Sequence, residues 1–193
     1  MSTKAPICEG EYNETEKAIR ALLAENGVAL KSNLVTNGDE KVPASAGQSP
    51  ETYLGLARAA RYQGNPELTN DTKNYKFSNS LLSNGWTLSG SFSATNELLT
   101  TKQDNAHLKY KFNAKEVYLV MGSADGSPKS VSVKVNGQLV SDLKGEDVNN
   151  TGILTVNGAR LYRLVKSPTL LNDAELELSL PSGVNLNAFT FGG

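Results

Sequence analysis

The stretch GWTLSGSF, residues 85–92, decides the fold class because its apolar and polar side chains alternate. Trp86, Leu88 and Phe92 fall on one side of an extended chain, and Thr and Ser residues fall on the other. Alternation with a period of two is typical of a strand with one buried face and one solvated face. We therefore predict a β-strand here, with Trp86 in the core rather than in a ligand site.

The same alternation continues towards the C-terminus, in residues 108–112, 131–135 and 175–180, while residues 117–121 (VYLVM) are apolar on both faces. Two Asn-Gly pairs, 136–137 and 157–158, separate such segments and are the strongest short-range signal for a hairpin. Roughly nine or ten short strands without helical crossovers predict an antiparallel sandwich of two sheets.

The first part of the chain has a different character. Residues 13–26 (NETEKAIRALLAEN) have a capping residue and apolar positions at helical spacing, which predicts one amphipathic helix. Residues 31–78 are largely polar, with Gly and Pro, and we interpret them as an irregular linker. Within this linker, Ser49 and Pro50 could open a short helix over residues 49–59.

The composition excludes several classes of protein. The formal net charge is −1, so no basic surface for nucleic acid is expected. No apolar run is long enough to span a membrane, and residues 1–17 lack the apolar stretch of a secretory signal. A single cysteine, Cys8, and a single histidine, His107, leave no Cys-x-x-Cys pair and no histidine metal cluster.

Several motifs follow one another in a fixed order: GEYNETEKAIRALLAENG, SPETYLGLARA, GWTLSGSF, VYLVMG, RLYRLV and a terminal FTFG. This set resembles the C-terminal region of DipZ-type proteins, thioredoxin-family proteins with a TlpA-like domain that are linked to cytochrome c biogenesis. The resemblance implies three parts: a remnant of the thioredoxin fold at 1–30, whose last helix is 13–26, a connecting segment at 31–78, and a jelly roll like that of carbohydrate-binding modules at 79–193.

The redox chemistry of that family needs a Cys-x-x-Cys pair, and Cys8 is alone, so we expect neither a catalytic residue nor a cofactor in this chain. The leading hypothesis is a non-catalytic module that binds a glycan or a cell-envelope polymer beside an attached or partner thioredoxin domain. The resemblance places it outside the cytoplasm, in a periplasmic setting. Two alternatives stay open: a fragment of a thiol–disulfide oxidoreductase whose Cys-x-x-Cys lies elsewhere, and a structural or dimerisation domain.

Sugar binding needs aromatic rings with polar groups beside them. On strands, Tyr118 and Tyr162 are the candidates for an exposed face, and Arg160 and Arg163 flank Tyr162. We therefore predict these four residues as ligand contacts.

The loop SDLKGEDVNN holds oxygen-bearing side chains that suggest a structural calcium: Asp142, Glu146, Asp147 and Asn149. Their spacing matches no defined calcium loop, so we favour an ordinary polar turn. No metal is expected.

Overall fold

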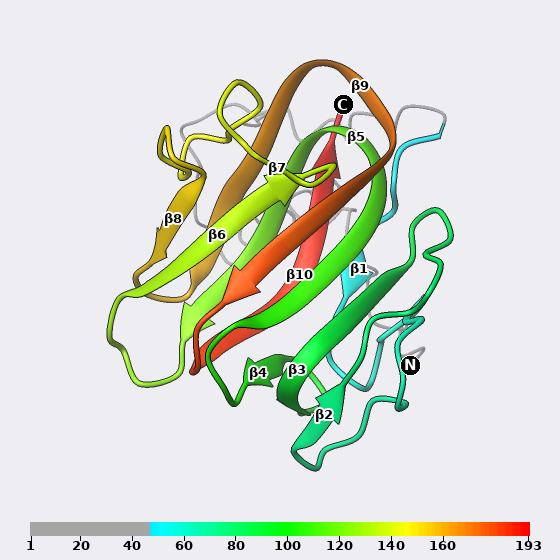
Figure 1. Ribbon diagram of the computed structural model, residues 1–193, viewed down its shortest axis with the longest axis vertical. Helices are drawn as coiled ribbons and strands as arrows, with labels where there is room; N and C mark the ends of the chain where they lie inside the picture. Colours follow the sequence, from blue (N-terminus) through cyan, green and yellow to red (C-terminus); the bar gives the residue numbers. More distant parts are fainter. Residues whose placement is uncertain (1–46) are drawn as a thin grey trace, which may run out of the picture. The chain divides into compact units, whose positions relative to one another are not determined.

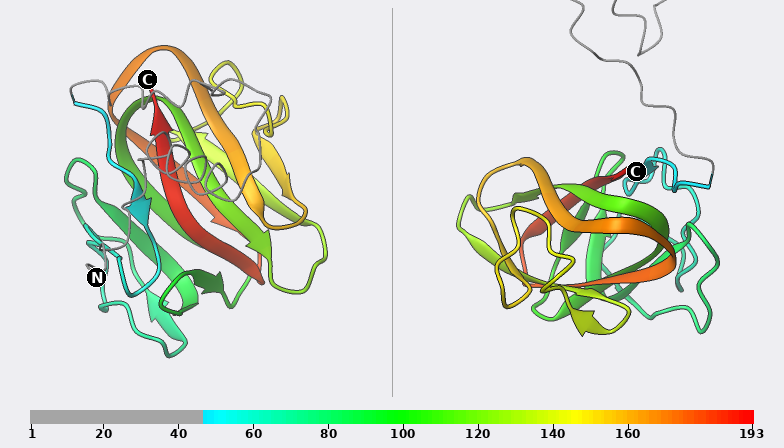
Figure 2. Two further views of the ribbon diagram at one scale, coloured as in Figure 1. Left: turned by 180° about the vertical axis from the view of Figure 1, so that it is seen from behind. Right: turned by 90° about the horizontal axis from the view of Figure 1, so that it is seen from above.

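The computed structural model describes residues 47–193, which belong to one compact unit, Ala44–Gly193, and contain ten strands and no helix. The strands are β1 (Thr52–Tyr53), β2 (Lys73–Tyr75), β3 (Trp86–Ala94), β4 (Leu99–Thr101), β5 (Ala106–Ser123), β6 (Lys129–Val135), β7 (Gln138–Leu139), β8 (Ile153–Val156), β9 (Arg160–Leu180) and β10 (Val184–Gly192). All strand pairings are antiparallel, and the strands stack in two layers (Figures 1 and 2). The predicted antiparallel β-sandwich is therefore confirmed.

Two long strands belong to both layers. The second half of β5 and the first half of β9 lie with β1 and β10 in what we call the first sheet. The first half of β5 and the second half of β9 lie with β3 and β6 in the second sheet, which β2, β7 and β8 extend. Register shifts between Phe112 and Glu116 mark the place where the β5–β9 ribbon bends. The alternation of apolar and polar residues stops at this bend, so the sequence predicts several short strands where the structure has two long ones.

The core lies between the sheets, as the alternation predicts. Trp86 is fully buried, and its indole N–H donates to the Ala60 carbonyl oxygen at 2.9 Å. Its ring packs against Tyr62 at 4.7 Å between centroids. On the neighbouring strand, Tyr110 is the register partner of Trp86 and contacts Phe189 and Phe191, with centroids 5.0 and 5.2 Å apart. The placement of Trp86 in the core is thus confirmed.

Two expectations about local structure need correction. Residues 49–59 form no helix: Thr52 and Tyr53 pair with β10 instead, because an open sheet edge offers their backbone stronger partners than one helical turn. The sandwich also begins well before residue 79, since Leu54 and Tyr75 are buried in its core. Residues 47–78 are therefore part of the domain and not a linker. The predicted helix 13–26 and the thioredoxin remnant 1–30 lie outside the described residues.

The two Asn-Gly pairs behave differently. Asn136 and Gly137 both have positive φ and join β6 to β7 in a hairpin, as predicted. Asn157-Gly158 does not close a hairpin, because β8 pairs with β6 whereas β9 starts in the other sheet. The chain instead crosses between layers at this point.

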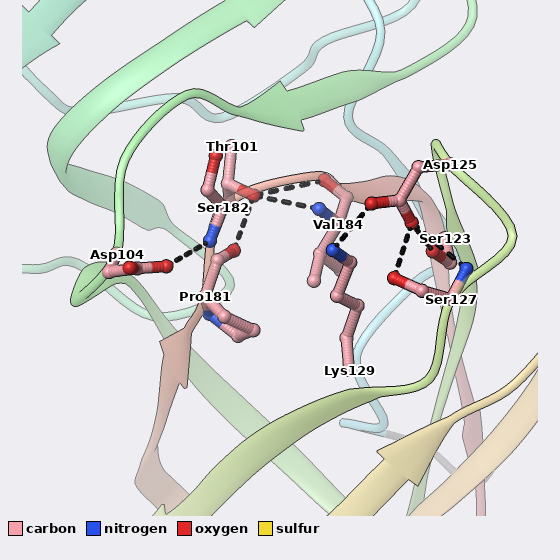
Figure 3. Close-up of polar contacts among 9 residues, drawn as sticks. All are labelled: Thr101, Asp104, Ser123, Asp125, Ser127, Lys129, Pro181, Ser182 and Val184. Atoms are coloured by element: carbon pink, nitrogen blue, oxygen red, sulfur yellow. Dashed lines mark hydrogen bonds and ion pairs between the residues drawn. The ribbon is translucent and has the colours of Figure 1, made fainter.

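One buried hydroxyl, that of Thr101, ties β4 to the turn between β9 and β10 (Figure 3). Thr101 Oγ1 accepts the backbone N–H of Val184 at 2.8 Å and donates to the Pro181 carbonyl at 2.7 Å. Its side chain is almost fully buried, so water cannot replace these partners. Beside it, the carboxylate of Asp125 accepts hydrogen bonds from Ser123, Ser127 and Lys129 and closes the β5–β6 loop (Figure 3).

Replacing Thr101 with valine is expected to lower the free energy of unfolding by about 1–3 kcal/mol, because the Val184 N–H is left buried without a partner. Urea denaturation followed by circular dichroism measures the change. The matched control is Thr155→Val, at an exposed position of β8, which should change stability little. An equal loss in both variants would mean that strand propensity, not the buried hydroxyl, sets the effect.

Among residues 47–193, no helix is long and apolar enough to cross a membrane.

Candidate functional site

Two of the predicted ligand contacts meet on the outer face of the first sheet. Tyr118 on β5 and Arg163 on β9 are register partners, and the guanidinium carbon lies 5.9 Å from the tyrosine ring centroid. Arg160 is the first residue of the same strand and lies over the ring of Tyr162 instead, and both arginines are about half exposed, at 50% and 49%. These side chains remain predictions as ligand contacts.

Tyr162 does not belong to this surface. It is fully buried, and its hydroxyl accepts the Asn157 N–H at 2.8 Å and donates to the Gly158 carbonyl at 2.9 Å. The guanidinium of Arg160 lies 3.8 Å from its ring centroid. Predicting an exposed face for Tyr162 was wrong, because the strand alternation turns it inward to hold the crossing between sheets.

The loop considered for calcium is occupied by protein partners. Asp147 accepts hydrogen bonds from the Arg160 guanidinium and the Arg163 backbone, both at 2.7 Å, and Glu146 pairs with Arg163 at 2.8 Å. Asn149 Oδ1 accepts from the backbone of Thr151 and Ile153, which is the polar turn that the sequence favours. Burial would raise the pKa of Asp147, but the hydrogen bonds from the arginines lower it below its usual value.

Asp142 is exposed in the same loop. Among the described residues, no group of three acidic, histidine or cysteine side chains is arranged to hold a metal ion.

The Tyr118 hydroxyl donates a hydrogen bond to the carboxylate of Glu116. Burial and this carboxylate raise the pKa of Tyr118 to about 12. The protonated phenol is therefore favoured more in the folded than in the unfolded chain, whose tyrosines ionise near pH 10. Its contribution to stability is complete below pH 10 and is lost as the pH rises towards 12.

We expect the free energy of unfolding to fall between pH 10 and 12, and the fall to be smaller in Tyr118→Phe. Urea denaturation at a series of pH values measures it. Glu116→Gln should bring the Tyr118 pKa down, seen as earlier phenolate absorbance. An unchanged alkaline profile in Tyr118→Phe would show that other groups carry this pH dependence.

A depression with a volume of about 530 Å³ lies at the β1 edge of the same face. We call it the Tyr53 pocket. It is lined by Glu51, Tyr53, Ala57, Arg58, Asn96, Glu97, Val120, Asn187 and Ala188. Tyr53 supplies an aromatic ring, Val120 and Ala188 supply aliphatic surface, and carboxylate and amide side chains surround them. An apolar floor with a few polar groups at the rim is the usual make-up of a small-ligand site.

Backbone hydrogen bonds hold the wall of the Tyr53 pocket. The segment after β1 lies against the β3–β4 turn: the N–H of Leu56 donates to the Thr95 carbonyl at 2.9 Å, and that of Ala57 to the Asn96 carbonyl at 3.1 Å. The Leu54 N–H donates to the Asn187 carbonyl at 2.8 Å. The two segments can pack this closely because residue 55 is glycine: a Cβ there would sit 2.5 Å from the Asn96 oxygen. The wall is therefore formed before any ligand arrives.

The guanidinium of Arg58 and the carboxylate of Glu51 both interact with Tyr53. The Arg58 guanidinium carbon lies 3.4 Å from the Tyr53 ring centroid, a cation–π contact that fixes both side chains. Burial and a hydrogen bond to Glu51 raise the pKa of the Tyr53 hydroxyl above its usual value, and Arg58 partly offsets this. At neutral pH the phenol is thus a neutral hydrogen-bonding group.

Sequence reasoning missed the Tyr53 pocket. Its residues come from four separate segments that only the strand pairing brings together, and the segment carrying Tyr53 and Arg58 was read as a helix. The available signal was the pair Thr52-Tyr53 followed by Gly55, because β-branched and aromatic residues favour an extended strand and glycine disfavours a helix.

A second depression of about 440 Å³ lies elsewhere, at the end of β9 near β6. Three serines line it together with Asp104, Asn105, Ile153, Leu180 and Pro181, and the lining contains no aromatic ring. It lacks the combination of ring and polar rim that the Tyr53 pocket has.

Comparison with known proteins identifies relatives. Residues 49–192 match a family model described as "Thioredoxin like C-terminal domain". The proteins named DipZ from Mycobacterium bovis and Mycobacterium tuberculosis are each 30% identical to this chain over 134 residues, or 65% of its length. The chain spans 19% of the length of these curated relatives.

Two solved structures share a more distant likeness. One is CsCBM6-3 from Clostridium stercorarium in complex with cellobiose, with 12% identity, a TM-score of 0.30, and coverage of 68% of this chain and 94% of that one. The other is a family 6 carbohydrate-binding module, with 11% identity, a TM-score of 0.30, and coverage of 63% and 92%. At this level of likeness neither ligand nor binding site carries over.

Proposed function

Because the chain belongs to the family of thioredoxin-like C-terminal domains, we propose that its β-sandwich is a non-catalytic module that binds a glycan in the Tyr53 pocket. The single observation that carries the proposal is the Tyr53 pocket itself, in which an aromatic ring and aliphatic side chains are surrounded by carboxylate and amide groups.

The chemistry of the pocket suits a sugar. One face of a sugar ring carries C–H bonds, which pack on an aromatic or aliphatic surface such as Tyr53 and Val120. Its hydroxyls need partners that donate and accept, and Asn96 and Asn187 offer both from their amides. Glu51 and Glu97 add acceptors of charge-assisted hydrogen bonds.

The rigidity of the pocket supports binding without a conformational cost. The segment after β1 is hydrogen-bonded to the β3–β4 turn and to β10, and that turn is closed by Thr95 Oγ1, which accepts the Leu98 N–H at 3.2 Å. Less entropy is lost when a ligand meets a preformed wall than when loops must order around it.

The lack of thiol chemistry supports a non-catalytic role. The chain has one cysteine and one histidine, so it offers no Cys-x-x-Cys pair for disulfide exchange. In a longer protein of this family, the module would hold an attached thioredoxin domain near a cell-envelope glycan, outside the cytoplasm. A purely structural or dimerisation role is the alternative.

The test is a titration of this chain with neutral and anionic oligosaccharides of glucose, mannose, galactose and arabinose, by isothermal calorimetry. Saturable binding of at least one series, weakened about tenfold or more in Tyr53→Ala, supports the proposal. Phe77→Ala is the control for the loss of an aromatic side chain, because this half-buried ring packs against His107 and Lys109 and does not line the pocket.

Two results would overturn the proposal. The first is the absence of saturable binding across the panel, which would favour the structural alternative. The second is shortening of the oligosaccharides during incubation, because a hydrolase is not a non-catalytic module.

A further inference from the structure

A row of apolar side chains crosses the outer face of the first sheet. Tyr53 of β1 is the register partner of Ala188 of β10, which in turn faces Val120 of β5. Val120 faces Leu161 of β9, which is 42% exposed. With strands about 4.8 Å apart, the row spans about 14 Å. Apolar surface thus continues beyond the Tyr53 pocket over the full width of the first sheet.

A second, polar row runs beside it. Thr190 of β10 faces Tyr118 of β5, which faces Arg163 of β9. Each lies two residues along its strand from a member of the apolar row, a step of about 7 Å on the same face. The hydrogen bonds of Tyr118 to Glu116 and of Arg163 to Glu146 hold these two side chains in place.

The charges along this face are largely paired. Arg163 forms an ion pair with Glu146, and Arg160 forms one with Asp147. In the Tyr53 pocket, the positive charge of Arg58 offsets the negative charge of one of the two carboxylates. A face without excess positive charge gives no attraction for a polyanion. Its complement is an uncharged ligand with alternating C–H and hydroxyl surface.

Building on the proposed function, we propose that the ligand is an internal stretch of a neutral, linear glycan that lies across the four strands of the first sheet. The apolar row meets the C–H faces of consecutive sugar rings, and the polar row meets their hydroxyls. A row of about 14 Å is longer than one ring, and about three rings match it. Leu161 then marks a subsite that only a longer oligosaccharide reaches.

The experiment measures affinity against chain length. The neutral oligosaccharide series that binds this chain is titrated at one, two, three and four units, into the unmodified chain and into Leu161→Ala. Affinity is expected to rise up to about three units and then level off. Leu161→Ala should weaken binding of the trimer about fivefold and leave the monomer unchanged. Leu139→Ala, an exposed leucine on β7 of the second sheet, is the matched control.

The outcomes separate this inference from the function on which it rests. If sugars bind but the affinity does not rise beyond that of the monomer, the extended site is overturned and the glycan module stands. The same holds if Leu161→Ala leaves the affinity for the trimer unchanged. Stronger binding of the uronate-bearing counterpart overturns the neutral ligand. Absence of binding at every length overturns both.

Discussion

Replacing Gly55 with alanine is expected to abolish glycan binding and to lower the free energy of unfolding by about 1–3 kcal/mol. The added Cβ collides with the backbone of Asn96 and Glu97, where the segment after β1 lies against the β3–β4 turn. Backbone cannot rotate away as a side chain does, so the two segments must separate. The hydrogen bonds from Leu56 and Ala57 are then lost, and the Tyr53 pocket loses its wall. Calorimetry and urea denaturation measure the two effects.

A milder variant tests the same wall of the Tyr53 pocket if Gly55→Ala folds poorly. Thr95→Val removes the hydroxyl that accepts the N–H groups of Glu97 and Leu98, without any collision. It should weaken binding to an intermediate degree. Gly122→Ala is the matched glycine control, because its Cβ would meet Ala159 at a milder 3.2 Å, outside the pocket. Normal binding by Gly55→Ala would contradict a preformed wall.

Replacing Trp86 with alanine is expected to cost about 3–5 kcal/mol of unfolding free energy. The indole is fully buried against Tyr62, and its N–H satisfies the Ala60 carbonyl. Truncation leaves a cavity and removes the contact that fastens residues 60–62 to β3. Urea denaturation followed by far-ultraviolet circular dichroism measures the loss, since the variant lacks the only tryptophan.

A companion variant separates packing from hydrogen bonding. Trp86→Phe keeps an aromatic ring but loses the donor to Ala60, so its cost should lie well below that of alanine. A cost below about 1 kcal/mol for Trp86→Ala would contradict the placement of this ring in the core.

The layers of the fold could be predicted from sequence because strand alternation is a local property. Trp86, Leu88 and Phe92 share a face whatever the partner strand is, and the same holds for Leu176, Leu178 and Leu180, all of which are buried. The pairing could not be predicted in the same way. Asn157-Gly158 has the composition of a hairpin turn, yet β8 finds its partner in β6, far back in the chain.

The site was predictable only in part, for a related reason. Tyr118, Arg160 and Arg163 were correctly expected at the surface because they sit within recognisable strands, and their role as ligand contacts remains a prediction. Tyr162 was misplaced, because one residue of register decides which face a side chain takes. Tyr53 was missed because a strand of two residues carries no periodicity, and its environment comes from β10, β5 and the β3–β4 turn.

The most direct test of a glycan site on this face is a titration of the isotope-labelled chain with the best-binding oligosaccharide, followed by backbone and side-chain NMR. The largest shifts are expected at Tyr53, Arg58, Asn96, Asn187 and Val120. Shifts confined to the second depression, near Ser130 and Ser179, or no shifts at saturating sugar, would contradict it.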